Sequence, residues 1–151
     1  RTHSMGYIEM EFIRGQSLDK YIESREGKQL PLAEVTMLLD QLCAVLSEAH
    51  GHIDEKRGKP APIIHRDLKP SNIMLVEQKN TGQAVLKVLD FGIAKIIEEG
   101  GGQDATLTNV GDLLGTPAYM SPEQIRGGWG KNGENPIDGR SDLYSVGIML
   151  Y

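Results

Sequence analysis

The hydrophobic positions of residues 32–50 repeat with the period of an α-helix. Counted from Val35, apolar side chains fall at i, i+3, i+4, i+7, i+10, i+11 and i+14, which places them on one face of a helix. They are Val35, Leu38, Leu39, Leu42, Val45, Leu46 and Ala49. We expect this helix to begin near Leu32 and to end before Gly51. At 1.5 Å per residue it would be roughly 28 Å long, long enough to form the centre of a lobe.

Shorter elements are predicted before and after this helix. Residues 5–12 alternate between apolar and polar side chains, which predicts a strand. Ser17 is placed to cap a short helix over residues 18 to about 26, and Gly27 would end that helix. Residues 52–62 are rich in charged residues, Gly and Pro, so we expect a surface loop there.

A β-hairpin should bring two polar clusters together. Residues 73–76 and 84–89 are apolar runs separated by the turn-forming residues 78–82. One cluster, at 65–72, lies just before the first strand, and the other, at 90–92, lies just after the second. Because the start of one antiparallel strand lies beside the end of its partner, we expect both clusters at the same edge of the hairpin.

The side chains of these clusters suit phosphoryl transfer. Asp67 can orient a hydroxyl group and accept its proton, and Lys69 can contact the γ-phosphate of a nucleotide. Asn72 and Asp90 offer the hard oxygen ligands that Mg²⁺ prefers.

Composition and charge exclude other classes of protein. Of 151 residues, 39% are hydrophobic and 25% are charged, which is typical of globular chains. The net charge of −5 argues against a nucleic-acid partner, because such proteins need a basic excess. The single cysteine, Cys43, cannot form an intrachain disulfide, and no Cys/His group has zinc-ligand spacing. We therefore expect a cytoplasmic protein.

Membrane contact is not expected from this segment, since no apolar run reaches the roughly 18–20 residues that span a bilayer. The sequence starts within a strand pattern and stops within an apolar helical pattern at 148–151, so we also expect it to be a fragment. The parent protein could be anchored to a membrane through a segment outside it.

Four motifs occur in the order found in eukaryotic-type protein kinases. Residues 65–72 resemble the catalytic loop of that family, and residues 90–92 resemble its magnesium-binding motif. Residues 116–123 resemble the end of the activation segment, and residues 142–147 are similar to the start of the helix that anchors the large lobe. The stretch around residues 115–124 looks like that of bacterial serine/threonine kinases.

The resemblance implies a role for each motif residue. Asp67 would be the catalytic base, and Lys69 would contact the γ-phosphate of ATP. Asn72 and Asp90 would hold Mg²⁺. Thr116 would contact Asp67 and Lys69. His65, by contrast, would support the neighbouring backbone and have no catalytic role.

A nucleotide site is implied near the start of the chain. Residues 10–14 match the segment that links the two kinase lobes. Backbone groups of Glu11 and Ile13 would then hydrogen-bond the adenine of ATP, with Met10 as the gatekeeper.

Regulation by phosphorylation is implied by Arg66, which precedes the catalytic aspartate. A phosphate in the activation segment, residues 90–123, would order that segment through Arg66. Thr106 and Thr108 are the best acceptors, and self-association would allow autophosphorylation. The alternative is that both are solvated loop threonines.

The fold implied is α+β, the mainly helical C-terminal lobe of a protein kinase truncated at both ends. Its large-lobe anchoring helix would start within residues 140–151. Its function would be transfer of the γ-phosphate of ATP to Ser/Thr hydroxyls of protein substrates, with ATP and Mg²⁺ as cofactors, and residues 1–151 alone should be inactive. Two alternatives remain open: a pseudokinase scaffold, and a small-molecule phosphotransferase of related fold.

Overall fold

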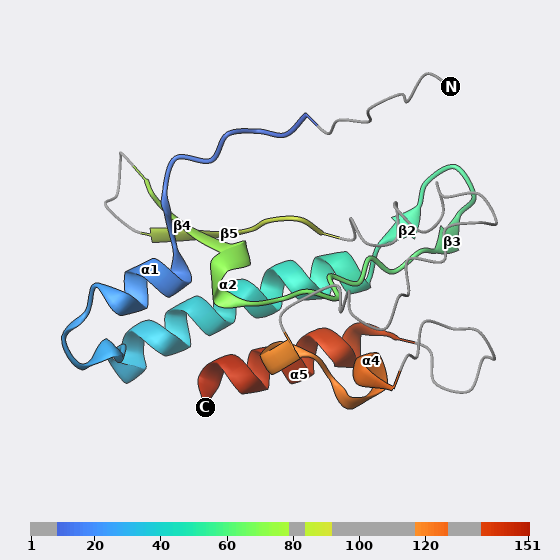
Figure 1. The fold of residues 1–151 in the computed structure, drawn as a ribbon. Coiled ribbons are helices and arrows are strands. Elements are labelled where there is room, and N and C mark those ends of the chain that lie inside the picture. Colours follow the sequence, from blue (N-terminus) through green and yellow to red (C-terminus); the bar gives the residue numbers. More distant parts are fainter. Residues whose placement is uncertain (1–8, 79–83, 92–116, 127–136) are drawn as a thin grey trace, which may run out of the picture.

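The computed structural model describes residues 9–78, 84–91, 117–126 and 137–151, in which a three-stranded sheet packs against helices (Figure 1). The α-helices are α1 (Leu18–Glu23), α2 (Leu32–His50), α4 (Pro122–Ile125) and α5 (Gly139–Leu150). The strands are β1 (Gln16–Ser17), β2 (Ile53–Asp54), β3 (Lys59–Pro60), β4 (Ile73–Glu77) and β5 (Ala84–Val88). Short 3₁₀ turns lie at Glu26–Lys28, Pro70–Asn72 and Pro117–Tyr119.

Helix α2 confirms the element predicted from the hydrophobic pattern. It begins at Leu32 and is followed by Gly51 as its C-cap. Leu38, Leu42 and Leu46 are its buried residues, four apart, as expected for one face of a helix. The side chains of this face pack in the hydrophobic core.

The predicted hairpin is also present. Strand β4 lies between β1 and β5 and is antiparallel to both, with Ile73 opposite Val88 and Glu77 opposite Ala84. The predicted turn at 78–82 lies outside the described residues except for Gln78. Helix α2 covers the open edge of β5: the backbone N–H of Leu86 donates to Oε1 of Gln41 at 2.9 Å, and Nε2 of Gln41 donates to the carbonyl of Ala84 at 3.3 Å.

One hydrophobic core joins the sheet, α2 and α5. Its buried members are Leu38, Leu42, Leu46, Leu68, Ile73, Leu75, Leu86 and Val146. Leu68 and Ile73 are fully buried, and they flank residues 69–72 in the chain. The core therefore fixes both ends of the segment that carries the candidate site.

The strand predicted at residues 5–12 is wrong for residues 9–12, and residues 5–8 lie outside the described residues. Residues 9–14 have no regular secondary structure, and Phe12 is 83% exposed. The alternating pattern needs a partner strand, and the antiparallel register with Gln16 opposite Leu75 carries residues 9–12 beyond Glu77, where β4 ends. The ladder begins only after Gly15, where a Cβ atom would lie 2.4 Å from the carbonyl oxygen of Leu75.

Two shorter predictions need correction. Helix α1 starts after Ser17 as expected but ends at Glu23, three residues early. The predicted loop at 52–62 contains the small hairpin β2–β3. Its turn is built locally: the carboxylate of Asp54 accepts the N–H of Lys56 at 2.9 Å, and Gly58 takes a φ of +61°.

Within the described ranges, no helix is both long enough and apolar enough to cross a membrane.

Candidate active site

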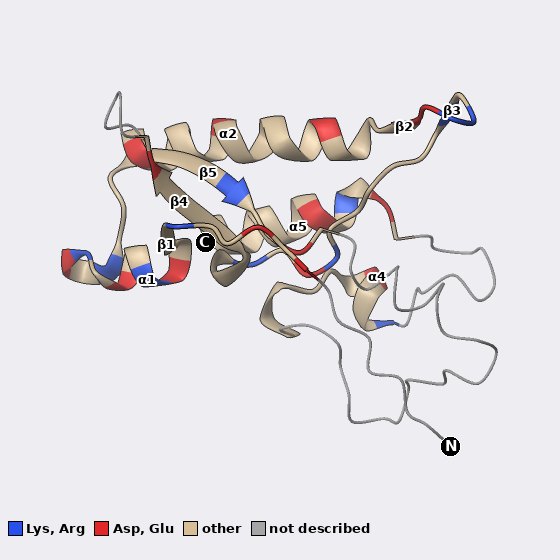
Figure 2. Cartoon of the chain, turned by 90° about the horizontal axis from the view of Figure 1, so that it is seen from above, with Lys and Arg blue, Asp and Glu red and all other residues tan. Residues whose placement is uncertain are grey.

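The backbone of residues 65–66 is held by a carboxylate from α5. One carboxylate oxygen of Asp142 accepts the N–H of His65 at 2.9 Å, and the other accepts the N–H of Arg66 at 2.9 Å. Asp142 is 1% exposed, so both bonds are shielded from water. Figure 2 shows acidic and basic residues side by side in the loop between the sheet and α5. The loop that begins at residues 65–66 is thus attached to α5 through its backbone N–H groups.

A histidine from the end of α2 completes the surroundings of Asp142. Nε2 of His50 lies 2.8 Å from the carboxylate. Gly139, at the start of α5, makes room for this ring, because a Cβ atom there would come within 2.5 Å of Nδ1 of His50. The same carboxylate therefore links α2, α5 and the loop.

His65 connects the loop to the far strand of the hairpin. Its Nε2 lies 2.7 Å from the carbonyl oxygen of Leu89, and its Nδ1 accepts the N–H of Asp67 at 3.3 Å. This pair of bonds fits the neutral ring with its proton on Nε2. The ring also meets Phe91 edge-on, with centroids 5.0 Å apart. His65 is 2% exposed and supports the backbone, the role the resemblance implies.

Three of the predicted site residues contact one another. Nζ of Lys69 lies 2.9 Å from Oδ2 of Asp67. Nδ2 of Asn72 donates to the backbone carbonyl of Asp67 at 2.8 Å and to its Oδ2 at 3.3 Å. Residues 70–72 form a 3₁₀ turn, which brings Asn72 back toward Asp67. Both side chains therefore fix the orientation of the Asp67 carboxylate.

The fourth residue, Asp90, lies directly after the hairpin. The backbone N–H of Leu89 donates to the carbonyl of Asn72 at 2.8 Å, so Asp90 follows immediately after the contact between the two clusters. Asp90 has a φ of +59°, a left-handed conformation that is rare outside glycine, and its side chain is exposed. Such backbone strain is concentrated at functional sites.

An amide oxygen and a carboxylate fit magnesium, which usually takes only one or two protein carboxylates and completes its shell with water and phosphate. Nδ2 of Asn72 is held by Asp67, which leaves the amide oxygen as the atom for a metal. The described residues contain no cluster of three or more His, Cys, Asp or Glu with metal-ligand geometry. The donor set therefore fits a metal shared with a phosphate and excludes a metal cage built from the described residues alone.

The predicted adenine-binding segment has no regular secondary structure and is mostly exposed. Met10 is 64% exposed, and the side chain of Glu11 is ion-paired with Lys87 of β5 at 3.2 Å. Ile13 is partly buried. The ion pair ties this segment to the strand that leads to Asp90.

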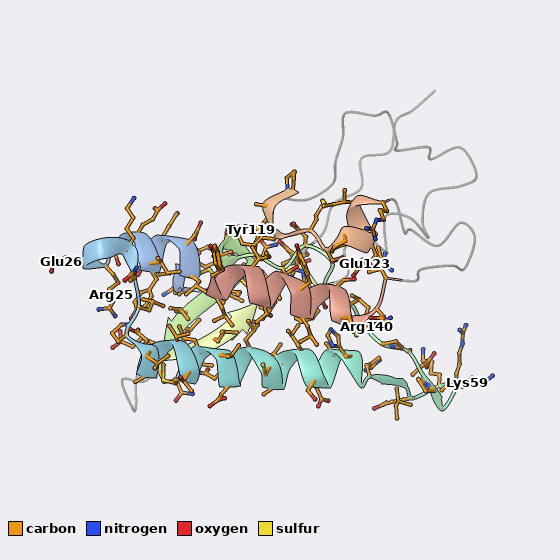
Figure 3. The ribbon with its side chains drawn as sticks, turned by 90° about the horizontal axis from the view of Figure 1, so that it is seen from below. Arg25, Glu26, Lys59, Tyr119, Glu123 and Arg140 are labelled. Carbon is orange, nitrogen blue, oxygen red and sulfur yellow. The ribbon has the colours of Figure 1, made fainter. Side chains whose placement is uncertain are left out.

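Residues 117–126 dock on α5 through two serine hydroxyls. Ser141 donates to the carboxylate of Glu123 at 2.5 Å, and Ser145 donates to the carbonyl of Tyr119 at 2.8 Å. Figure 3 shows the labelled Tyr119 and Glu123 on the side of the segment that faces α5. Hydrogen bonds from Ser141 and, next, Ser121 lower the pKa of Glu123 below its usual 4.5. Thr106, Thr108 and Thr116 lie outside the described residues.

Asp142 is the positioning residue to which sequence reasoning gave no role. Its signal was an acidic residue on the buried face of a helix, beside Ser141, Ser145 and Val146. A carboxylate in that position needs hydrogen-bond donors, and backbone amides of a distant loop are suitable ones.

Comparison with known proteins decides the family. The model of the family described as "Protein kinase domain" matches residues 1–151. The chain belongs to this family. Serine/threonine-protein kinase pkn3 of Myxococcus xanthus is 44% identical over 147 residues, which are 96% of this chain and 23% of that protein. Serine/threonine-protein kinase A of Synechocystis is 38% identical over 142 residues, 94% of this chain and 24% of that protein.

The solved structures agree on the fold of this kinase domain. A mutant of the PknI kinase domain of Mycobacterium tuberculosis superposes with a TM-score of 0.58 at 24% identity, covering 93% of this chain and 40% of that one. The α+β, protein-kinase-like fold is therefore confirmed, and so is the resemblance to bacterial serine/threonine kinases. The chain spans about a quarter of the length of the curated relatives it matches.

Proposed function

We propose that this kinase domain carries the phosphotransfer site of a longer serine/threonine protein kinase, which moves the γ-phosphate of ATP to Ser or Thr hydroxyls of proteins. The observation that carries the proposal is the convergence of Lys69 and Asn72 on Oδ2 of Asp67, next to Asp90. The names of the curated relatives support the choice of acceptor.

In this proposal Asp67 is the catalytic base. The acceptor hydroxyl lies against its carboxylate, which orients the oxygen and accepts the proton as the oxygen–phosphorus bond forms. The bond between the γ-phosphorus and its bridging oxygen breaks, and ADP leaves. Lys69 and Asn72 hold the carboxylate in one orientation, so no rearrangement is needed during transfer.

Lys69, Asn72 and Asp90 would address the nucleotide. The Lys69 ammonium is within reach of both Asp67 and a γ-phosphate placed beside it. Asn72 and Asp90 would hold Mg²⁺, which neutralises phosphate charge when it is bound. Thr116 would contact Asp67 and Lys69 from the activation segment.

Backbone groups of Glu11 and Ile13, with Met10 as gatekeeper, would bind the adenine. Residues 9–14 have no regular secondary structure, which supports this role because their backbone is not part of a ladder. The partners would be protein substrates and a second copy of the same kinase during autophosphorylation. We propose the cytoplasm, where ATP is abundant, as the compartment.

Two substitutions in the full-length protein test these roles. Asp67→Asn should abolish phosphotransfer and leave ATP affinity within about threefold, since Asp67 addresses the hydroxyl. Asp90→Asn should weaken magnesium-dependent ATP binding as well. Steady-state kinetics and nucleotide titration with and without Mg²⁺ separate the two. If both variants had the same kinetics and the same nucleotide affinity, the role assignment would be wrong.

A further inference from the structure

Both backbone polar groups of Arg66, the residue just before the proposed base, are hydrogen-bonded to side chains from other elements. Arg66 has a φ of +69°, which non-glycine residues keep only where the surroundings hold them. Its N–H donates to Asp142 of α5 at 2.9 Å. Its carbonyl oxygen accepts Nε2 of Gln124 at 2.5 Å. Asp67 is the next residue, so the two anchors determine where its backbone starts.

The amide of Gln124 is held in one orientation. Gln124 is 6% exposed and lies in α4, and its Oε1 accepts both the backbone N–H of Ser121 at 3.0 Å and the Ser121 hydroxyl at 3.1 Å. With the oxygen directed at Ser121, the nitrogen is directed at Arg66. A carboxylate would keep the acceptor but lose the donor, and asparagine would be one methylene too short.

Helix α4 is itself fixed to α5, which supplies the other anchor. Ser141 and Ser145 of α5 bind Glu123 and the carbonyl of Tyr119. The contacts therefore close a ring that runs from α4 to Arg66, from Arg66 to Asp142, and through α5 back to α4. A change in the docking of residues 117–126 would therefore move the donor that binds the carbonyl oxygen of Arg66.

We propose that Gln124 is a positioning residue that couples the docking of residues 117–126 to the backbone of the catalytic loop. This inference rests on the proposed function for its kinetic consequence, but the contact itself is independent of it. Loss of the Gln124 donor would let the left-handed Arg66 relax and shift Asp67 relative to the hydroxyl. Displacements of about 1 Å can cost about a hundredfold in rate.

Three substitutions in the full-length protein test the coupling. Gln124→Glu keeps the acceptor for Ser121 and removes the donor to Arg66, and Gln124→Met removes both. Leu39→Ala is the control, because Leu39 is partly buried against the core at α2 and its loss lowers thermal stability without touching α4. For each variant, kcat, KM for ATP, melting temperature and hydrogen exchange of the Arg66 and Asp67 amides are measured.

Both Gln124 variants should lower kcat about tenfold or more, with KM for ATP within about twofold of wild type. The exchange of the two amides should be at least about fivefold faster. Leu39→Ala should lower the melting temperature at least as much and leave kcat and these amides unchanged. Unchanged kcat in Gln124→Glu, or equal losses in the control, would overturn the proposal. If the wild-type protein transferred no phosphate, the proposed function would fail, and the exchange rates would still decide the coupling.

Discussion

At the scale of single residues, the site depends on carboxylates whose hydrogen bonds are buried. Asp142 accepts two loop amides and contacts His50, although it lies 76 and 77 residues from the amides it binds. Each bond to a charged acceptor contributes about 1.5–3 kcal/mol. One side chain therefore accounts for much of the order of the loop.

Asp142→Asn should destabilise the protein by about 3 kcal/mol or more and lower its activity. One oxygen becomes an NH₂ group, which must face a backbone N–H donor and leave it unsatisfied in the interior. Chemical unfolding of the full-length protein measures the loss. Asp138→Asn is the control, because Asp138 caps the same helix at a side chain that is 43% exposed. Equal stability of the two variants would contradict the anchoring role.

Glu123 should make the docking of α4 sensitive to acid. Its folded pKa is lowered by Ser141 and Ser121, so its contribution to stability is present above its unfolded pKa of 4.5 and is lost as pH falls through the lower folded value. The melting temperatures of wild type and Ser141→Ala should therefore differ most near neutral pH and converge below about pH 4.5.

Ser145→Ala provides the comparison for that titration. Ser145 binds a neutral carbonyl, that of Tyr119, so the deficit of this variant should not vary with pH over the same range. If the loss of melting temperature caused by Ser141→Ala stayed constant or grew as pH fell, the folded protein would not favour the ionised form of Glu123.

At the scale of elements, the sheet depends on α2 for one of its edges. Gln41 supplies an acceptor and a donor to β5, the outer strand of the order β1-β4-β5. The strand that leads to Asp90 is thereby fixed to α2.

Gln41→Leu should cost about 1–3 kcal/mol of stability, because the partly buried backbone groups of Leu86 and Ala84 lose their partner. Asp40→Leu, at an exposed position of the same helix, should change stability by less than about 0.5 kcal/mol. Denaturant unfolding compares the two. If both substitutions changed the free energy of unfolding by similarly small amounts, water would be replacing the Gln41 amide at the edge of β5.

Periodic hydrophobic patterns predicted the helices and strands whose signal extends over many of their own positions. The stripe from Val35 to Ala49 gave α2 with both ends, and two apolar runs gave β4 and β5, because each signal is summed over many positions. The strand at residues 5–12 failed for residues 9–12, since a strand also needs a partner. The hairpin within 52–62 was missed because two-residue strands carry almost no pattern.

The sequence motifs contain the residues that we propose to contact the substrate, but not the residues that hold those side chains and their backbone in place. Asp67, Lys69 and Asn72 lie within six residues of one another and could be recognised together. Asp142, Gln124 and Gln41 act on backbone groups 43 to 77 residues away. Backbone amides and carbonyls are the same at every position, so nothing in the sequence marks which one a distant side chain will bind.

At the scale of the whole molecule, we expect a switch in the activation segment. The full-length kinase should phosphorylate itself within residues 104–114, with Thr106 and Thr108 as acceptors. A phosphate adds about −1.5 to −2 charge, enough to order a segment when an arginine such as Arg66 is within reach.

Replacing both threonines with Ala should lower activity, and Arg66→Ala should make the enzyme indifferent to that replacement. Mass spectrometry locates the phosphate, and activity assays compare the three variants. Phosphate found only outside residues 104–114, or full activity of the double-Ala variant, would remove the proposed switch.

Transfer of labelled γ-phosphate from ATP to protein measures the proposed phosphotransfer directly. Full-length wild-type protein, given ATP and Mg²⁺, should place phosphate on Ser or Thr side chains of a protein substrate. Asp67→Asn, matched in folding and in ATP binding, should place none. Mass spectrometry identifies the acceptor residues. No transfer by the wild-type protein would contradict the proposed kinase activity, and equal transfer by Asp67→Asn would contradict the role of Asp67 as the base.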